Sequence, residues 1–482
     1  MTTLLHLTST CAGPTQARQV TAGHAALPRR QQHRVCSEGC CCFAQRSRCS
    51  RLAARQSKLC PAVAALRRRS SSPVEGPAQR SSQQCHAASP ALMPTTDPSL
   101  MNERDRTTLA ETLGYRSIGA ELPAKVSLST INQSLPRDVF EINGWKAWGA
   151  VATSLAAFSL SLGLIAVAPW WLLPFAWAFS GTAFTGFFVI GHDCGHRSFS
   201  KNNLLEDIVG TLAFMPLLYP FEPWRIKHNV HHSHTNKLVE DTAWHPIPTK
   251  DMEKWGPVQS AIAKFFLGSP LKLWASIGHW IIYHFDLSLY TAKQRPRVIV
   301  SLAAVASFAL VALPALWAAA GPWGLVKFWF MPWLGYHFWM STFTVVHHTA
   351  PHIPFKPASE WNAAQAQLSG TVHCDYPRWV EFLCHDINVH VPHHVSSKIP
   401  WYNLRRATDS LRSNWGEFMT ECHWNWRMMR TIFTELHFYS DEGAYTAFDH
   451  EAELPFWKLQ RALIPNSNTA PWTPKQKFYK QP

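Results

Sequence analysis

Two long stretches of this 482-residue chain carry almost no charge, and they constrain its fold more than any other feature. Residues 147–191 contain no Asp, Glu, Lys or Arg, and residues 298–346 contain only one, a lysine. A helix needs about 20 apolar residues to cross the hydrocarbon core of a bilayer, so each stretch is long enough for two crossings. Pro169 and Gly321 lie near the midpoints, where a turn would divide each stretch. We therefore predict an all-α membrane protein with two transmembrane hairpins, four spans in total.

The hairpins also predict which segments share one side of the membrane. Each hairpin returns the chain to the side from which it entered, so residues 91–146, 192–297 and 347–482 lie together. Residues 197–297 carry 12 basic and eight acidic residues, whereas the two hairpin turns carry none. By the positive-inside rule the shared side is the cytoplasm-equivalent compartment. Within it we expect interfacial helices in residues 192–297 and a helical cap in residues 347–482.

The first ninety residues differ in composition from the rest of the chain. They hold 13 basic and two acidic residues, and eight of the 12 cysteines. Segments rich in Arg and Ser and poor in acids are typical of organelle transit peptides, so we predict that residues 1–90 are a disordered leader that is cleaved. A disordered basic tail, or a metal cluster at Cys40–Cys42, is the alternative. The remaining 392 residues are nearly neutral, which argues against binding of nucleic acid.

Histidines are unusually numerous, 25 in all, and they cluster in three short motifs. The first follows the first apolar stretch, the second comes about thirty residues later, and the third follows the second stretch. On a helix, residues i, i+3 and i+4 share a face, so each motif presents two or three imidazoles in one direction. The motif histidines are His192 and His196, then His228, His231 and His232, then His390, His393 and His394.

Eight histidines exceed what one metal ion can bind, so the count predicts a site for two metals. Imidazole suits iron, copper, nickel and zinc. His348, at the end of the second apolar stretch, is a ninth candidate, although the adjacent His347 is an alternative to it. Asp193 and Asn388 are expected to orient ligand rings by hydrogen bonding.

A transition-metal transporter is a competing interpretation of a histidine-rich membrane protein. Transporters place ionisable residues within their spans along the ion path. Here the spans contain only Lys327 and His337, and the histidine motifs stand outside them. The pattern therefore favours an enzyme.

The motifs and their surroundings resemble the membrane fatty-acyl desaturase family, which has an HxxxH, an HxxHH and a later HxxHH around two spanning hairpins. The strings GHDCGHRSFSKNN, KHNVHHSHTN, FTVVHHTAPHIP and HDINVHVPHH look like the plastid omega-6 branch of that family in particular. The resemblance covers roughly residues 100–460. It implies that two non-haem iron ions are bound by the eight motif histidines and by His348, with His234 incidental.

The resemblance also implies an activity. Members use O₂ and two electrons from ferredoxin to remove two hydrogens from adjacent methylenes of acyl chains in membrane glycerolipids, here at the omega-6 (delta-12) position. It further implies a multi-pass protein of a chloroplast membrane, inner envelope or thylakoid, with its histidine motifs facing the stroma. A fatty-acyl hydroxylase or acetylenase on the same diiron scaffold is the alternative activity.

Two further expectations concern surfaces. An acyl chain needs a hydrophobic tunnel beneath the metal centre. Candidates to line it are the aromatic residues Phe187, Phe188, Trp224, Phe338 and Trp339. Ferredoxins are acidic, so a basic patch would steer their docking. Candidates for that patch are Lys398, Arg405, Arg406 and Arg412.

Overall fold

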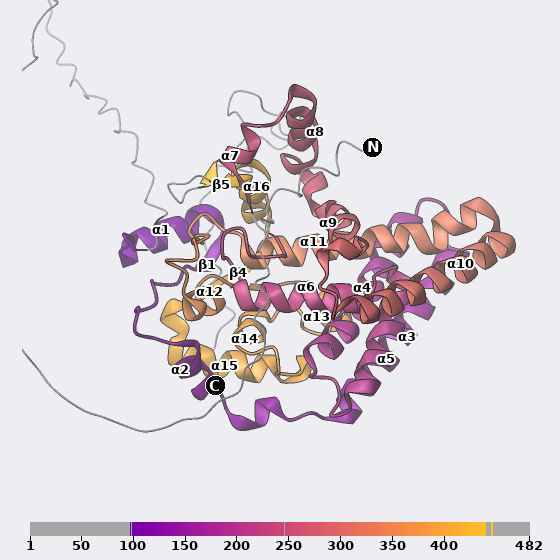
Figure 1. The fold of residues 1–482 in the computed structure, drawn as a ribbon, viewed down its shortest axis with the longest axis horizontal. Helices are drawn as coiled ribbons and strands as arrows, with labels where there is room; N and C mark the ends of the chain where they lie inside the picture. The colour runs from indigo at the N-terminus through magenta and orange to yellow at the C-terminus, as the bar shows by residue number, and fades with distance from the viewer. Residues whose placement is uncertain (1–96, 98, 245, 440–444, 447–482) are drawn as a thin grey trace, which may run out of the picture. The chain divides into compact units, whose positions relative to one another are not determined.

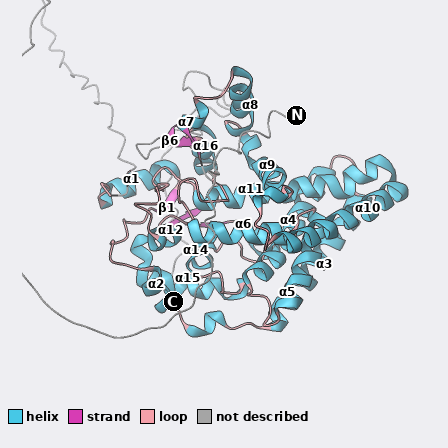
Figure 2. Cartoon of the chain, viewed as in Figure 1, coloured by secondary structure: helices cyan, strands magenta, loops and turns pink. Residues whose placement is uncertain are grey.

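A computed structural model describes residue 97 and residues 99–244, 246–439, 445 and 446 of the chain. The predicted leader, residues 1–90, lies outside the described residues. Helices make up most of the described part, and strands occupy small patches of it (Figure 2). The prediction of a largely helical protein is therefore confirmed.

Three helical stretches of the described chain are long and apolar enough to cross a membrane. Two are single helices, and the third, Arg295–His348, comprises three consecutive elements. The elements are α3 (Gly144–Val167), α4 (Leu173–His196), α10 (Arg295–Leu325), the π-helical η6 (Val326–Phe330) and α11 (Met331–His348).

The third stretch is not straight. Gly321 has φ 68° and ψ −174°, a conformation that only glycine adopts readily, and it interrupts the helical backbone. The chain turns back near this point and returns along α11 toward the rest of the molecule (Figure 1). The first two helices are separated by residues 168–172, which include the predicted turn at Pro169.

Helix α4 lies at the centre of the fold and packs against α3, α11 and α5 (Asn203–Phe214). Every residue from Ser180 to His196 is buried. Close approach is possible because small residues meet at the crossing with α11: a Cβ atom placed on Gly181 would lie 2.5 Å from the Cα atom of Gly335. Sequence analysis ended this span at residue 191, but the helix continues to His196, so the first histidine motif occupies its last turns.

Shorter helices flank the apolar ones, in the regions where interfacial helices were expected. Helix α5 leads through η3 (Met215–Leu217) into α6 (Phe221–His234), and the chain bends by 102° between them. A second series carries several exposed apolar side chains, among them Val258 and Phe265. It consists of α7 (Thr249–Met252), α8 (Pro257–Leu267), η4 (Pro270–Trp274), α9 (Ala275–His284) and η5 (Leu287–Leu289).

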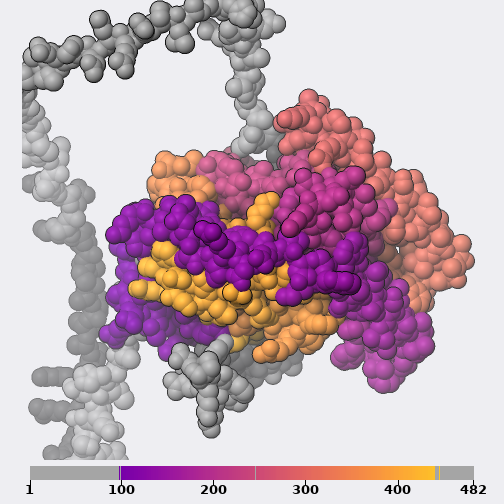
Figure 3. Space-filling model, turned by 90° about the horizontal axis from the view of Figure 1, so that it is seen from below, coloured from indigo at the N-terminus to yellow at the C-terminus, as the bar shows by residue number. Residues whose placement is uncertain are grey.

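The remaining elements form a cap that joins both ends of the described chain. In Figure 3 the segment near residues 100–140 runs across the C-terminal part. Its helices are α1 (Glu103–Leu113), α2 (Leu128–Gln133), η2 (Arg137–Phe140), α12 (Ala363–Leu368), α13 (Arg378–Leu383), α14 (His390–Val395), η7 (Trp401–Asn403), α15 (Leu404–Trp415), η8 (Gly416–Phe418) and α16 (Trp426–Thr434).

The all-α prediction missed two small sheets in this part of the molecule. In the first, the order is β1-β4-β3, with β4 antiparallel to β1 and parallel to β3; in the second, the order is β2-β5-β6. Their strands have only two to four residues, too few for an alternating pattern to be legible in sequence. The strands are β1 (Tyr115–Ser117), β2 (Ile247–Pro248), β3 (Val372–Asp375), β4 (Thr420–His423), β5 (Phe438–Tyr439) and β6 (Tyr445–Thr446).

The crossing of α4 and α11 generates the first prediction. Gly181→Ala should lower the free energy of unfolding by about 1–3 kcal/mol, because the added methyl group meets backbone atoms that cannot yield independently. Thermal unfolding of the detergent-solubilised protein would measure this. The matched control is Gly163→Ala in α3, where an added Cβ atom has no neighbour within 4 Å. An equal effect of both substitutions would contradict the proposed packing constraint.

Candidate metal centre

The nine histidines singled out in sequence lie together in the structure, in two adjacent groups. In the first group, one ring nitrogen from each of five residues lies within 4.8 Å of the others: His192, His196, His228, His232 and His393. In the second group the same holds for His231, His348 and His394. The Nε2 atom of His390 lies 3.0 Å from those of His348 and His394, so His390 completes the second group.

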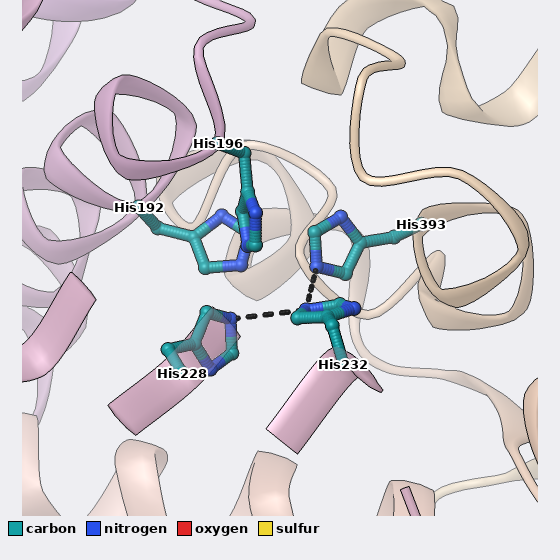
Figure 4. Close-up of side chains that lie close together, drawn as sticks. All are labelled: His192, His196, His228, His232 and His393. Atoms are coloured by element: carbon teal, nitrogen blue, oxygen red, sulfur yellow. Dashed lines mark hydrogen bonds between the residues drawn. The ribbon is translucent and has the colours of Figure 1, made fainter. Parts of the chain in front are cut away.

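Four helices supply these side chains, and helical spacing aims them inward. Figure 4 shows the first group converging: His192 and His196 come from the end of α4, His228 and His232 from α6, and His393 from α14. Because residues i and i+4 share a helix face, the first two pairs each point in one direction. His231, on the same helix, belongs to the second group, so α6 contributes side chains to both groups.

Burial keeps five of these imidazoles neutral. The pKa values of His228 and His232 on α6, and of His390, His393 and His394 on α14, lie well below the ordinary value, mainly because burial disfavours the charged ring and secondarily because the other imidazoles are close. Neutral imidazole is the form that binds a metal ion.

Hydrogen bonds in the second group determine which nitrogen carries the proton. The Nδ1 atom of His390 lies 3.3 Å from the carbonyl oxygen of Ile387, and that of His394 lies 2.8 Å from Oε1 of Gln367. These oxygens only accept, so both Nδ1 atoms donate and both Nε2 atoms are left with a bare lone pair. Yet these two Nε2 atoms face each other at 3.0 Å.

Such an arrangement fits a bound cation and little else. Two lone pairs at this distance repel each other unless a positive ion lies between them. Metal–nitrogen bonds of about 2.0–2.1 Å at tetrahedral to octahedral angles place ligand nitrogens roughly 3.0–3.4 Å apart. The Nε2–Nε2 distances are 3.3 Å for His231–His348, 3.2 Å for His228–His232 and 3.0 Å for His232–His393.

The rest of the first group fits a metal equally well. The Nε2 atoms of His192 and His196 are buried without a hydrogen-bond partner in the described part of the chain. An orphaned buried nitrogen is costly unless an ion or ligand satisfies it. The Nδ1 atom of His192 lies 3.3 Å from a carboxylate oxygen of Asp193, in keeping with the orienting role expected of this aspartate.

Sequence analysis missed two residues that orient ligand rings. Asp241 accepts from the Nδ1 atom of His231 at 2.7 Å and from the backbone N–H of Asn236 at 2.9 Å. Gln367 accepts from His394 and donates to the backbone oxygen of His232, so it spans both groups. Only the fold places these two residues beside the histidines. Asp241 follows His231 by ten residues in a loop, and Gln367 lies on α12, outside any histidine motif.

Two uncertain assignments can be described geometrically. Asn388 donates to the backbone oxygen of Cys374 and to Glu381, both at 3.0 Å, and neither of these hydrogen bonds reaches one of the nine histidines. His347 donates from Nδ1 to the carbonyl of Val372 at 2.7 Å. It lies beside the second group, whereas His348 lies in it.

Other histidines near the two groups have different neighbours. His234 contacts Glu240, His352 contacts Thr420, His373 contacts Asp375, and His385 contacts Ser154. His337, inside α11, bonds to Ser276 at 2.8 Å. These histidines lie outside both groups.

A cavity of about 340 Å³ opens beside the histidines. Members of both groups form part of its wall, and most of the remaining wall is apolar or aromatic. Of the five aromatic residues expected there, Phe188 and Trp224 line it, whereas Phe187, Phe338 and Trp339 pack elsewhere. The histidines in the wall are His192, His228, His231, His348 and His390, with His279 farther along.

Comparison with known proteins assigns the chain to a family. Residues 127–426, more than half of the chain, match the family model described as fatty acid desaturase. The chain belongs to the fatty acid desaturase family. The resemblance recognised in the sequence is thereby confirmed, and with it the assignment to the oxidoreductases.

Close relatives extend the match beyond the family level. The chain is 55% identical to the chloroplastic omega-6 fatty acid desaturase of Brassica napus over 375 residues, which cover 77% of this chain and 84% of the relative. It is 56% identical to the protein of the same name from Spinacia oleracea, over 75% of this chain and 80% of the relative. It is 52% identical to the sn-1 oleoyl-lipid 12-desaturase of Anabaena variabilis, over 67% of this chain and 93% of the relative.

The structure places the residues of the predicted basic docking patch in contacts within the chain. Arg405 is paired with Asp386 and Glu381, Arg406 with Asp138, and Arg412 with Glu421. Lys398 donates to the backbone oxygen of His196 at 2.9 Å. Three of the four charges are therefore neutralised within the chain, which sequence alone could not reveal because the acidic partners of Arg406 and Arg412 come from other elements.

Asp241 generates the second prediction. Asp241→Ala should weaken metal binding about 10–100-fold, because His231 loses the acceptor that fixes its tautomer and ring orientation. Metal content after dialysis against graded chelator concentrations would measure the affinity. The control is Asp251→Ala, which removes an exposed carboxylate paired only with Lys254 among the described contacts. Metal affinity unchanged in Asp241→Ala would rule out the orienting role.

Proposed function

We propose that this chain is an acyl-lipid omega-6 (delta-12) desaturase, which introduces a second cis double bond into monounsaturated acyl chains of plastid membrane glycerolipids. It uses O₂ and electrons from ferredoxin. The names of the relatives from Brassica napus, Spinacia oleracea and Anabaena variabilis support this activity. The observation that carries it is the pair of bare Nε2 lone pairs on His390 and His394. They belong to a group of nine histidines, seven of them buried, beside an apolar cavity.

We further propose that the nine histidines hold two iron ions, one in each group, with His348 rather than His347 as the ninth ligand. Bound iron would supply the activation of O₂ that is needed to break unactivated C–H bonds, which no side chain accomplishes. The chain's own residues have supporting tasks. Asp241, Asp193 and Gln367 hold the ligand rings in position, and the buried surroundings keep bulk water from the reacting carbons.

The cavity suits an acyl chain. Its wall contains residues of both histidine groups, so a chain lying in it passes both metals. The other wall residues include Phe188, Trp224 and Phe343, whose rings contact methylene groups favourably and position them. The lining contains no Asp or Glu among the described residues, consistent with a substrate segment that carries no charge.

The proposed setting is a plastid membrane, crossed four times, with the histidines on the stromal side. Two of the crossings would be α3 and α4, and the other two would be the arms on either side of Gly321. The excess of basic residues in segment 197–297 supports this sidedness. The chloroplastic relatives support the compartment.

A fatty-acyl hydroxylase is the competing activity on the same scaffold. It would transfer an oxygen atom to the first carbon radical instead of removing a second hydrogen. The identity of 55% to omega-6 desaturases over most of the chain favours desaturation. Product analysis separates the two.

Expression of the full chain in a host with plant-type ferredoxin and abundant monounsaturated lipid tests the proposal. We expect a new diene whose second double bond lies at the omega-6 position, because the histidines and the cavity present an acyl chain to oxygen activation. Mass spectrometry of fatty-acid methyl esters, with double-bond location, is the measurement.

Two variants complete this experiment. His231→Ala should abolish the diene, since it removes a ligand of the second group. His423→Ala should retain it, because this half-exposed histidine lies outside both groups. A hydroxylated monoene as the main product would show that the chain is a hydroxylase and not a desaturase. A diene in His231→Ala would exclude the proposed metal centre.

A further inference from the structure

Electrons must reach the proposed metal centre from a carrier in solution, although most of the nine histidines are buried. A surface centred on Trp361 is connected to these histidines by hydrogen bonds. This inference rests on the proposed function, because it concerns how that function receives its electrons.

Trp361 is connected to the second histidine group through a single residue. Its indole Nε1–H donates to the backbone oxygen of Thr235 at 2.9 Å. The Thr235 hydroxyl donates to the backbone oxygen of His231 at 2.7 Å and lies 3.3 Å from Nδ1 of His394. Electronic coupling through short runs of covalent and hydrogen bonds exceeds coupling across empty gaps, so this connection is a favourable path for an electron.

The indole is half-buried, and its surroundings hold it in place. The ring of His234 stacks against it at a centroid distance of 6.3 Å and an interplanar angle of 27°. The Lys237 ammonium lies 5.4 Å from the centre of the ring. Aromatic stacking and a cation over the ring both restrain the side chain. Trp361 is thus a fixed, partly exposed aromatic group rather than a mobile one.

Position favours access from solution. Helix α12 begins two residues after Trp361 and lies on the opposite side of the molecule from α10, one of the apolar helices (Figure 1). Near the indole, Lys237 pairs with Glu240 and Lys356 with Glu360, so the local charges balance. A partner here would contact the indole itself.

We propose that Trp361 is the point at which reduced ferredoxin, a one-electron iron–sulfur carrier, delivers electrons toward His394 through Thr235. In each transfer one ferredoxin is oxidised by one electron, and two transfers serve one turnover. No bond is made or broken at the indole, and the ring itself is neither oxidised nor reduced. Trp361 is therefore a positioning residue that couples the carrier to the centre.

Rapid mixing tests this. The iron-loaded full chain would be mixed anaerobically with reduced ferredoxin, and ferredoxin oxidation followed by absorbance, per bound iron. Trp361→Phe keeps an aromatic ring but removes the Nε1–H donor, and it should slow ferredoxin oxidation about tenfold or more. Iron content, thermal unfolding and the rate of reduction by dithionite, a small donor that needs no docking site, should be unchanged.

The matched control is Trp415→Phe. Trp415 is also half-buried and donates its Nε1–H to a side chain, Ser134, at 2.9 Å, but it packs in the apolar cluster of the cap, away from the histidine groups. This variant should oxidise ferredoxin at the wild-type rate. A wild-type rate in Trp361→Phe, or equal slowing of the dithionite reaction, would overturn the inference.

A second measurement is independent of iron and of folding changes at Trp361. A photo-crosslinking benzoylphenylalanine would replace Ser359, an exposed residue near the indole, or Ser413, an exposed residue of α15. Ferredoxin should crosslink at position 359 and not at 413; the reverse would overturn the proposed entry point. If the wild-type chain, loaded with iron, oxidises no ferredoxin at all, the ferredoxin partner of the proposed function fails together with this inference.

Discussion

Repulsion between nitrogen lone pairs is the constraint on which the site depends. His390 and His394 each donate from Nδ1 to an oxygen, and their bare Nε2 atoms are held 3.0 Å apart in a buried setting. Protonation would relieve the repulsion in water, but burial lowers the pKa of both rings. A metal cation bound between the two atoms would compensate it. Folding of this region and metal binding would then be coupled, as they are wherever ligands converge only in the folded state.

The helices that bring the histidines together leave little space for larger side chains where they contact each other. Helix α4 must bring its last turns between α3, α5 and α11, which is feasible because glycines let neighbouring groups approach. Gly181 meets Gly335 across α11, and a Cβ atom on Gly191 would lie 2.2 Å from the ring of Phe214. Helix α4 is therefore held by a backbone contact with α11 and by a close contact with the ring of Phe214.

Much of this could be predicted from sequence, for identifiable reasons. Long uncharged stretches predict long apolar helices. The i, i+3, i+4 spacing of histidines depends only on local helix geometry, so it predicts which side chains share a face. Asp241, Gln367 and the short strands could not be predicted, because their roles depend on which distant segments meet. The ion pairs of Arg405 and Arg406 illustrate the same limit. The basic residues could be recognised in the sequence, but their pairing with Asp386 and Asp138 is seen only in the structure.

Helix α6 has a consequence for how the site assembles. It contributes His228 and His232 to one group and His231 to the other, from adjacent positions on one rigid backbone. An ion bound in either group immobilises the helix, and the entropy lost in that step need not be lost again when the second ion binds. The two metal ions of the proposed centre should accordingly load cooperatively, so that half-filled molecules are scarce at intermediate metal concentrations.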